Sequence, residues 1–274
     1  MANQRIFITG GASGLGKAIA LRFARAGWHV CIGDVNDARG DEALKELSAL
    51  APQAHYQRCD VRREEDLQDA RDWLNAQWGG VDVVVNNAGV AQAGAIEDVS
   101  IEDWQWIIDI NLLGVVRGCK VFTPDFKKQG HGHIVNVASM AGLLDVPLMS
   151  SYNATKAAVV SLSETLHNEL AEYGVGVSVV CPSFFKTNLG DSLRTTDPRL
   201  GATMARLLER SAITADDIAN DIFTAVAQRG FYILPHADGR RTWRMKRLLP
   251  RELYSWMLRR STRGMRHGSR PTSP

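Results

Sequence analysis

The alternation of short apolar runs with stretches of helical spacing constrains this chain more than any other feature. The runs are β-branched and nearly continuous in apolar character, as is typical of strands covered on both faces of a parallel sheet. Strands that alternate with helices form right-handed βαβ units, so the pattern predicts an α/β fold with a doubly wound sheet. The expected strands are Arg5–Thr9, His29–Gly33, Ala54–Cys59, Val81–Val85, His133–Ala138, Gly176–Cys181 and Phe231–Leu234.

The segments between these strands have helical apolar spacing. A chain of 274 residues fits one large α/β domain. We therefore expect a single dinucleotide-binding and catalytic domain over residues 1–239, in which the less regular residues from about 184 to 212 form a substrate lid. Thr214 is the expected N-cap of the last helix of that domain. The expected helices are Gly16–Ala26, Glu42–Leu50, Glu64–Gln77, Ile101–Phe126, Tyr152–Tyr173 and Ile213–Gln228.

The charge of the chain is unevenly distributed. Residues 240–274 contain eleven Lys and Arg and one acid, Glu252, which gives +10; since the whole chain has +2, residues 1–239 carry −8. Apolar residues such as Trp243, Leu253 and Trp256 interleave with the arginines, and Pro250 separates two short helices. This basic amphipathic extension either packs on the body, contacts an anionic membrane surface, or binds an acidic carrier. No motif indicates nucleic-acid binding.

The cysteines and the N-terminal residues indicate the cellular compartment of the protein. Cys31, Cys59, Cys119 and Cys181 are scattered in apolar contexts without metal or redox spacing, so we expect reduced, buried thiols and no metal site. The first residues lack the pattern of a signal peptide, and no apolar run is long enough to cross a membrane. These features favour a cytoplasmic protein, with peripheral membrane contact as an alternative raised by the basic extension.

A glycine-rich turn follows the first strand and opens directly into a helix. The turn reads Thr9-Gly10-Gly11-Ala12-Ser13-Gly14-Leu15-Gly16. Glycines there allow a tight turn and close approach of a pyrophosphate, while the helix N-terminus offers N–H groups to the phosphates. The turn lies between the first strand and first helix of a βαβ series, which favours a dinucleotide site over an ordinary turn.

Acidic and small residues end the next three strands. Asp34 can accept hydrogen bonds from the adenosine ribose and repels a 2′-phosphate, and neither Ser13 nor Val35 is basic, so NAD is favoured over NADP. Asp60, followed by Val61, ends the third strand and can face the adenine amino group. The fourth strand closes with the small residues of Asn86-Asn87-Ala88-Gly89 beside the expected adenine ribose.

A tyrosine and a lysine share one face of the helix that follows the fifth strand. Tyr152 and Lys156 lie four positions apart, so we expect the lysine charge and the nicotinamide ring to lower the phenol pKa and make Tyr152 a general base or acid. Ser139 ends the preceding strand and can bind the substrate oxygen. Asn111 can bend its helix and hold a water on Lys156.

Together these motifs resemble the short-chain dehydrogenase/reductase family over about residues 5–235. The resemblance implies a Rossmann-like sheet of about seven strands, hydride transfer on nicotinamide, and a catalytic tetrad of Asn111, Ser139, Tyr152 and Lys156, in which Lys156 also holds the nicotinamide ribose. Pro182 and Thr187 match the segment that contacts the nicotinamide, although Ser183 replaces the family's glycine. The expected cofactor-binding residues are Gly10, Ser13, Gly14, Leu15, Gly16, Asp34, Asp60, Val61, Asn87, Ala88, Gly89, Tyr152, Lys156, Pro182 and Thr187.

Apolar residues near the catalytic end indicate the substrate. The expected wall residues favour a small lipophilic secondary alcohol or ketone; they are Leu143, Leu144, Val146, Met149, Phe184 and Phe185. Met204, Leu207 and Leu208 fit one face of a short lid helix. Reduction of a 3-oxoacyl thioester is the alternative reaction, with the basic extension on an acidic carrier. A catalytically silent NAD-binding sensor is the alternative from another class. Family analogy implies a homodimer or homotetramer, the dimer forming through the long helices around Asn111 and Tyr152.

Overall fold

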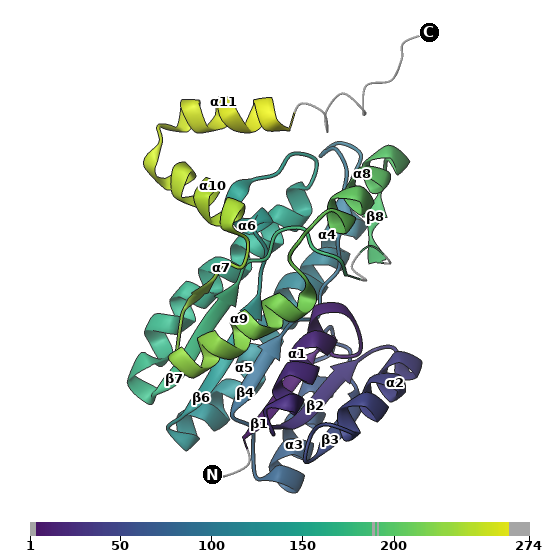
Figure 1. The fold of residues 1–274 in the computed structure, drawn as a ribbon, viewed down its shortest axis with the longest axis vertical. Helices are drawn as coiled ribbons and strands as arrows, with labels where there is room; N and C mark the ends of the chain where they lie inside the picture. The colour runs from purple at the N-terminus through teal and green to yellow at the C-terminus, as the bar shows by residue number, and fades with distance from the viewer. Residues whose placement is uncertain (1–3, 188–189, 191, 263–274) are drawn as a thin grey trace.

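A computed structural model describes residues 4–187, 190 and 192–262 of the chain (Figure 1). Seven parallel strands form the main sheet in the order β3-β2-β1-β4-β6-β7-β9, and two short strands, β5 and β8, pair separately. The strands are β1 Arg5–Thr9, β2 His29–Asp34, β3 Ala54–Arg58, β4 Val83–Asn86, β5 Gln92–Ala93, β6 Gly132–Val137, β7 Val175–Val180, β8 Arg194–Thr195 and β9 Tyr232–Ile233. The predicted doubly wound α/β fold with about seven strands is confirmed.

Helices cover both faces of the sheet. The helices are α1 Gly14–Arg25, α2 Asp37–Ser48, α3 Glu64–Trp78, α4 Ile101–Ile108, α5 Gly114–Gln129, α6 Ala141–Leu144, α7 Ser150–Leu170, α8 Pro198–Glu209, α9 Ala215–Gln228, α10 Ala237–Leu248 and α11 Arg251–Ser261. One apolar core joins the strands to α1, α2 and α9, and the other joins them to α3, α5 and α7. This two-sided burial explains why the central strands are apolar at successive positions.

The strand order reverses between β1 and β4. In a doubly wound sheet, the connections on either side of such a switch point leave to opposite faces, which opens a crevice at the carboxyl ends of the two strands. Gly10 follows β1 and Asn87 follows β4, so the glycine-rich turn and the small-residue segment meet at this crevice.

Several helices differ from the sequence prediction. The long helix expected over Ile101–Phe126 is broken by a π-helical turn at Asp109–Leu113, and α2 begins at Asp37 rather than Glu42. The lid segment contains α8 and β8. Thr214 caps α9 in a reciprocal capping box with Asp217, as predicted.

The basic extension forms two helices, α10 and α11, separated at Pro250 as predicted. They lie beside α6, at the end of the molecule that holds the carboxyl ends of the strands (Figure 1). Within the described residues, no helix is long and apolar enough to cross a membrane. The same residues hold no group of three or more metal-ligating side chains. All four cysteines are buried free thiols.

Candidate active site

The glycine-rich turn packs directly against the end of β4. Gly10 (φ +63°) and Gly14 (φ +51°) have left-handed backbones, which glycine adopts without strain. A Cβ on Gly10 would lie 2.9 Å from the Cα of Ala88, and one on Gly16 would collide with the carbonyl oxygen of Gly10. Packing and backbone conformation both require glycine at position 10, backbone conformation favours it at position 14, and packing requires it at position 16.

Side-chain hydrogen bonds join the two strand ends across the switch point. Asn87 Nδ2 donates to the carbonyl oxygens of Thr9 (2.9 Å) and Gly10 (3.2 Å). Thr9 Oγ1 accepts from the backbone N–H groups of Asn87 (3.0 Å) and Ala88 (3.1 Å). These bonds fix the turn against the segment after β4 without filling the crevice between them.

A cleft of about 610 Å³ runs along the carboxyl ends of the strands. Every predicted cofactor-binding residue lines it except Gly16, whose place is in the packing beneath the turn. The cleft also contains residues that sequence reasoning missed. Among them are Arg39, Arg58 and Arg62 at the end near Asp34, and Trp106, Ile110 and Ser192 elsewhere.

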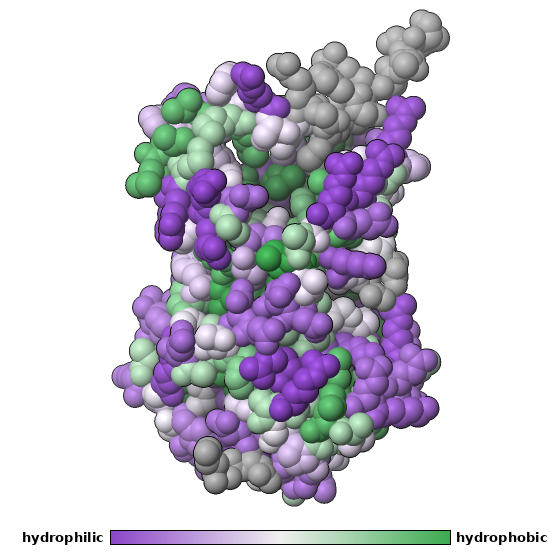
Figure 2. Space-filling model, in the orientation of Figure 1, coloured by the Kyte–Doolittle hydropathy of each residue, from purple (hydrophilic) through white to green (hydrophobic). Residues whose placement is uncertain are grey.

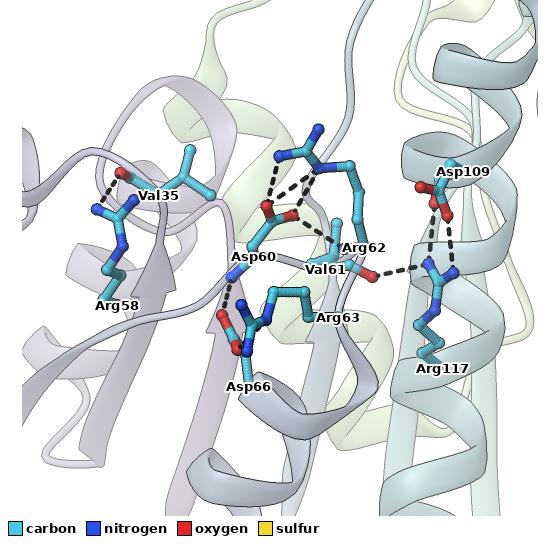
Figure 3. A network of polar contacts seen from close by, with 9 residues as sticks. All are labelled: Val35, Arg58, Asp60, Val61, Arg62, Arg63, Asp66, Asp109 and Arg117. Carbon is cyan, nitrogen blue, oxygen red and sulfur yellow. Dashed lines mark hydrogen bonds and ion pairs between the residues drawn. The ribbon is translucent and has the colours of Figure 1, made fainter.

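Asp34 is oriented by backbone donors. Its carboxylate oxygens accept hydrogen bonds from the N–H groups of Ala12 (3.1 Å) and Asn36 (3.0 Å). Arg58 lies on the next strand, where its guanidinium donates to the carbonyl oxygen of Val35 (2.9 Å) (Figure 3). The same guanidinium pairs with Asp37 (2.7 Å). The carboxylates of Asp34 and Asp60 and several guanidinium groups thus share this end of the cleft.

Asp60 is held by a neighbouring arginine. Arg62 forms a bidentate pair with its carboxylate, the shortest contact being 2.6 Å, and this pair holds the pKa of Asp60 below its usual range. The Asp60 N–H donates to Asp66 (2.9 Å), which fixes the main chain at the rim of the cleft (Figure 3). Arg117 extends the network by donating to the carbonyl oxygen of Val61 (3.1 Å) and to Asp109 (2.7 Å).

At the other end of the cleft, α7 presents Tyr152 and Lys156 from one face. Lys156 Nζ donates to the carbonyl oxygen of Val137 (2.9 Å) and lies 5.8 Å from the centre of the Tyr152 ring. Ser139 ends the strand region beside them; its Oγ accepts from the N–H of Ala141 (3.1 Å), and a hydrogen bond links it to Tyr152. The side chains of Ser139, Tyr152 and Lys156 are all nearly buried.

Burial controls the protonation of this pair. It raises the pKa of Tyr152, and the hydrogen bond with Ser139 offsets only part of that effect. Burial also lowers the pKa of Lys156 to about 8. In the protein alone the pKa of Tyr152 is therefore raised, contrary to the expected lowering by Lys156, because desolvation of the phenolate is the largest effect. The expected lowering of this pKa by the nicotinamide ring stays a prediction.

Asn111 lies in the π-helical turn, fully buried behind the cleft. Its side chain accepts from the Val90 N–H (2.8 Å) and donates to the Val90 carbonyl oxygen (2.9 Å). A Cβ on Gly89 would lie 3.2 Å from Asn111 Oδ1 and 3.5 Å from Lys156 Nζ, so the two side chains flank this glycine. Such π turns frequently mark functional sites. The water expected between Asn111 and Lys156 stays a prediction.

A second cavity of about 210 Å³ opens beside Ser139 and Tyr152. Of the expected wall residues, Leu144, Val146, Met149, Phe184 and Phe185 line this cavity, whereas Leu143 is buried in the main core and does not. Tyr152, Pro182, Phe185 and Thr187 line both this cavity and the large cleft. Met204 and Leu208 of the expected lid helix also line the cavity. The apolar wall residues that sequence reasoning did not name include Ala91, Met140, Ala141 and Leu193.

Ser183, which replaces the family's glycine, contacts a residue at the start of the C-terminal helices. The Ser183 N–H donates to His236 Nδ1 (3.1 Å), and Ser183 does not adopt a positive φ. His236 immediately precedes α10, so the turn after β7 is held by the start of the C-terminal helices. Sequence reasoning could not find this contact because 53 residues separate its partners.

The long cleft fits a dinucleotide. The glycines leave backbone space that a Cβ would fill, the helix N-terminus of α1 faces the cleft, and Asp34 and Lys156 stand at opposite ends. With the Ser139, Tyr152 and Lys156 side chains at one end, fold and site define a nicotinamide-dependent oxidoreductase. A family model described as short chain dehydrogenase matches residues 4–198. The chain belongs to this short-chain dehydrogenase family.

Relatives and solved structures agree with this assignment. The chain is 33% identical over 250 residues to a C alpha-dehydrogenase of Sphingobium sp., covering 87% of this chain and 82% of the relative. It is 34% identical over 186 residues to a 3-oxoacyl-acyl-carrier-protein reductase of Thermotoga maritima, covering 68% and 76%. A short-chain dehydrogenase/reductase of Burkholderia phymatum in complex with NAD is 33% identical with a TM-score of 0.84, covering 99% of this chain and 97% of that one.

Proposed function

We propose that this protein interconverts a lipophilic secondary alcohol and the matching ketone, with NAD as cofactor. The observation that carries the proposal is the position of Tyr152, which lines both the dinucleotide cleft and the small apolar cavity. Apart from Ser139, Tyr152 and a few small hydroxyl groups, the side chains around that cavity are apolar. A substrate with one polar oxygen and an apolar body matches such a lining.

The protein residues have distinct roles in this reaction. The nicotinamide, when bound, supplies the acceptor or donor of the hydride. Tyr152 gives its hydroxyl proton to the carbonyl oxygen during reduction, or accepts the alcohol proton during oxidation. Ser139 stabilises the substrate oxygen as charge develops on it. Lys156 keeps positive charge near the phenol below pH of about 8 and fixes its own position through the Val137 carbonyl.

The preference for NAD rests on Asp34. A carboxylate held by two backbone N–H groups stays at the adenosine end of the cleft, where it accepts from ribose hydroxyls and repels a 2′-phosphate. Two of the arginines at this end are paired with carboxylates, Arg58 with Asp37 and Arg62 with Asp60. Their charges are thereby partly neutralised, which supports NAD over NADP.

Replacing Tyr152 with Phe tests the chemistry. Removing the proton donor should lower kcat by about a hundredfold or more, while NADH binding, measured by fluorescence titration, changes little because the ring remains. Tyr173→Phe is the matched control: Tyr173 is exposed in the 3-10 turn Ala171–Tyr173 that follows α7, so this variant should leave kcat unchanged. Retained turnover in Tyr152→Phe would contradict the assignment of Tyr152.

The substrate class is tested by a panel of steroids, aliphatic alcohols, aromatic diols and acyl thioesters, followed through NADH absorbance. We expect turnover of uncharged, lipophilic secondary alcohols or ketones. A preference for 3-oxoacyl thioesters would instead support the second reaction, which the Thermotoga relative and the basic extension favour. Tight NADH binding without turnover of any compound would support a sensor.

We further propose a homodimer and a peripheral location for the protein. The exposed side of α7 carries the small residues Ala154, Ala157 and Ser161, which would allow close packing against a second copy.

The peripheral location is supported by the extension, where Leu248 (83% exposed), Leu253 (45%) and Trp256 (53%) lie among arginines. Figure 2 shows apolar surface beside hydrophilic surface over α10 and α11, at the upper left, which supports contact with an anionic membrane.

A further inference from the structure

Helix α6 forms part of the substrate wall and is too short to hold itself in place. It has four residues, Ala141–Leu144, and the last four carbonyl groups of any α-helix lack partners within the helix. A Cβ on Gly142 would lie 2.5 Å from the backbone carbon of Lys156, so α6 packs directly on the catalytic part of α7. Leu144 and the preceding Met140 line the substrate cavity.

The backbone after α6 is strained. Asp145 (φ 56°) and Leu148 (φ 63°) both adopt the left-handed conformation, which residues with a Cβ avoid unless the surrounding structure imposes it. The same segment carries Val146 and Met149, which also line the substrate cavity. Asn153 donates to the Val146 carbonyl (2.7 Å), and Gly94 donates to the Leu148 carbonyl (2.8 Å).

The C-terminal helices supply the partners that α6 lacks. Lys246 of α10 donates to the Leu143 carbonyl (2.8 Å) and pairs with Asp145 (2.5 Å). Tyr254 of α11 donates to the Leu144 carbonyl (2.9 Å). Tyr254 is only 7% exposed, and burial raises its pKa to about 12, so it remains a donor throughout the working pH range.

Packing reinforces these bonds. Gly239, near the start of α10, lies against Met140, where a Cβ would come within 3.1 Å of the methionine side chain. Trp243 packs on the core cluster that includes Met140 and Leu143, with its ring 5.1 Å from that of Tyr232. Helices α10 and α11 therefore contact the residue that follows Ser139, the end of α6 and the strained turn beyond it.

We propose that α10 and α11 form a clamp on the substrate wall, with Lys246 and Tyr254 as positioning residues that set the size and shape of the apolar cavity. Neither residue touches the cavity itself; each acts by capping a carbonyl of α6. The clamp accounts for part of the basic extension without a membrane or a carrier. Its effect on substrate choice rests on the proposed dehydrogenase function, whereas its effect on the backbone does not.

The test uses full-length Tyr254→Phe and Lys246→Met variants, which remove the donors and keep the side-chain bulk. Because each leaves a helix-end carbonyl without its partner, hydrogen exchange of amides in residues 141–149 should become about tenfold faster. Tyr173→Phe removes a phenol hydroxyl and Arg244→Met removes a positive charge at exposed positions, and both should leave that exchange unchanged. Lys246→Arg retains a donor and should restore most of the protection.

Kinetics provide the second measurement. For a large apolar ketone, kcat/KM should fall about tenfold through KM in both variants, whereas a small ketone that does not reach the wall should be affected less than about twofold. NADH affinity should stay unchanged. Unaltered exchange in residues 141–149 of both variants would overturn the clamp. Wild-type protein without ketone turnover would refute the proposed function instead, and the exchange measurement would still decide the clamp.

Discussion

The two titratable side chains at the catalytic end are both buried, and burial favours the neutral form of each. It raises the pKa of Tyr152 and lowers that of Lys156 to about 8. The protein alone thus holds Tyr152 as a hydroxyl, ready to donate a proton to a carbonyl. Its use as a base in alcohol oxidation requires additional positive charge near the phenol, which an oxidised nicotinamide ring would supply.

Asp34 carries the cofactor prediction. We expect kcat/KM with NADH to exceed that with NADPH, and Asp34→Asn to reduce this ratio about tenfold, because the variant removes the charge that repels a 2′-phosphate. Initial rates with both cofactors at fixed substrate measure the ratio.

Asp41→Asn is the control for this experiment, since Asp41 is an exposed acid on α2 and loses the same charge. It should leave the ratio within about twofold of the wild type. A wild-type preference for NADPH would show that the arginines at this end of the cleft outweigh Asp34.

At this end of the cleft, the sequence predicted the strand-end residues but not the arginines. Asp34, Asp60 and the glycines stand at strand ends, and strand ends in a parallel sheet converge on one edge, so spacing along the chain places them together. Arg39 is different: it lies on a helix, and its position beside the cleft depends on how α2 packs. The bidentate capture of Asp60 by Arg62 depends on side-chain rotamers, which no sequence pattern specifies.

At the scale of elements, the pairing of β6 with β7 contains a buried histidine. His133 lies opposite Gly176, whose missing side chain makes room for the imidazole ring. Ser178 Oγ donates to the Gly230 carbonyl (2.6 Å) and so accepts from His133 Nε2–H (2.7 Å), which assigns the neutral tautomer. Burial, with Arg229 and His167 adding to it, lowers the pKa of His133 to about 4.

We therefore predict that His133 destabilises the fold in acid. Between its ordinary pKa of 6.5 and the folded value of about 4, the unfolded chain binds the proton and the folded chain does not, so stability falls as pH decreases through this window. His133→Gln keeps a donor for Ser178 without a titratable group. The free energy of unfolding of the variant minus that of the wild type should increase by up to about 3 kcal/mol when the pH falls from 7.5 to 4.5.

Urea denaturation at both pH values measures this difference. At pH 7.5 the difference in unfolding free energy reports only how the substitution changes packing, because His133 is neutral in both the folded and the unfolded chain. Equal pH dependence in the two proteins would show that His133 does not contribute to acid unfolding.

Local signals predicted most elements, and tertiary effects account for the differences. The strands are recognisable because both their faces are buried, and Thr214 was predictable as a cap from its neighbours. The π-helical turn around Asn111 was not, since it arises where the Asn111 side chain bonds to Val90 on another segment. The four-residue helix α6 has too few residues for a periodic pattern.

At the scale of the whole molecule, the extension has two different faces. Tyr254 points inward to α6, while Leu253 and Trp256 are exposed and Arg260 lies over the Trp256 ring at 5.6 Å. The three roles left open from sequence are thus not exclusive: one face packs on the body, and the other is available to a surface. The sequence could not separate these faces because helical spacing leaves undetermined which part of an apolar stripe meets the body.

We predict that the protein binds weakly to anionic vesicles and hardly at all to zwitterionic ones, and that binding to the anionic vesicles decreases as salt rises. Trp256→Glu should reduce this binding, as measured by co-sedimentation, because it removes an exposed aromatic ring and adds a negative charge. Leu50→Glu adds the same charge on exposed surface near the end of α2, and it should reduce vesicle binding only by the small effect of one added negative charge. Salt-independent binding would argue against electrostatic attachment.

The contacts of Lys246 and Tyr254 also bear on the order in which a newly made chain acquires its properties. Every residue that lines the cofactor cleft precedes residue 193, whereas the clamp helices α10 and α11 are synthesised only after residue 236. Domains generally fold as their chain emerges. A growing polypeptide would then be able to hold a dinucleotide before it can select a substrate, so competence for chemistry and choice of substrate would arise at different times.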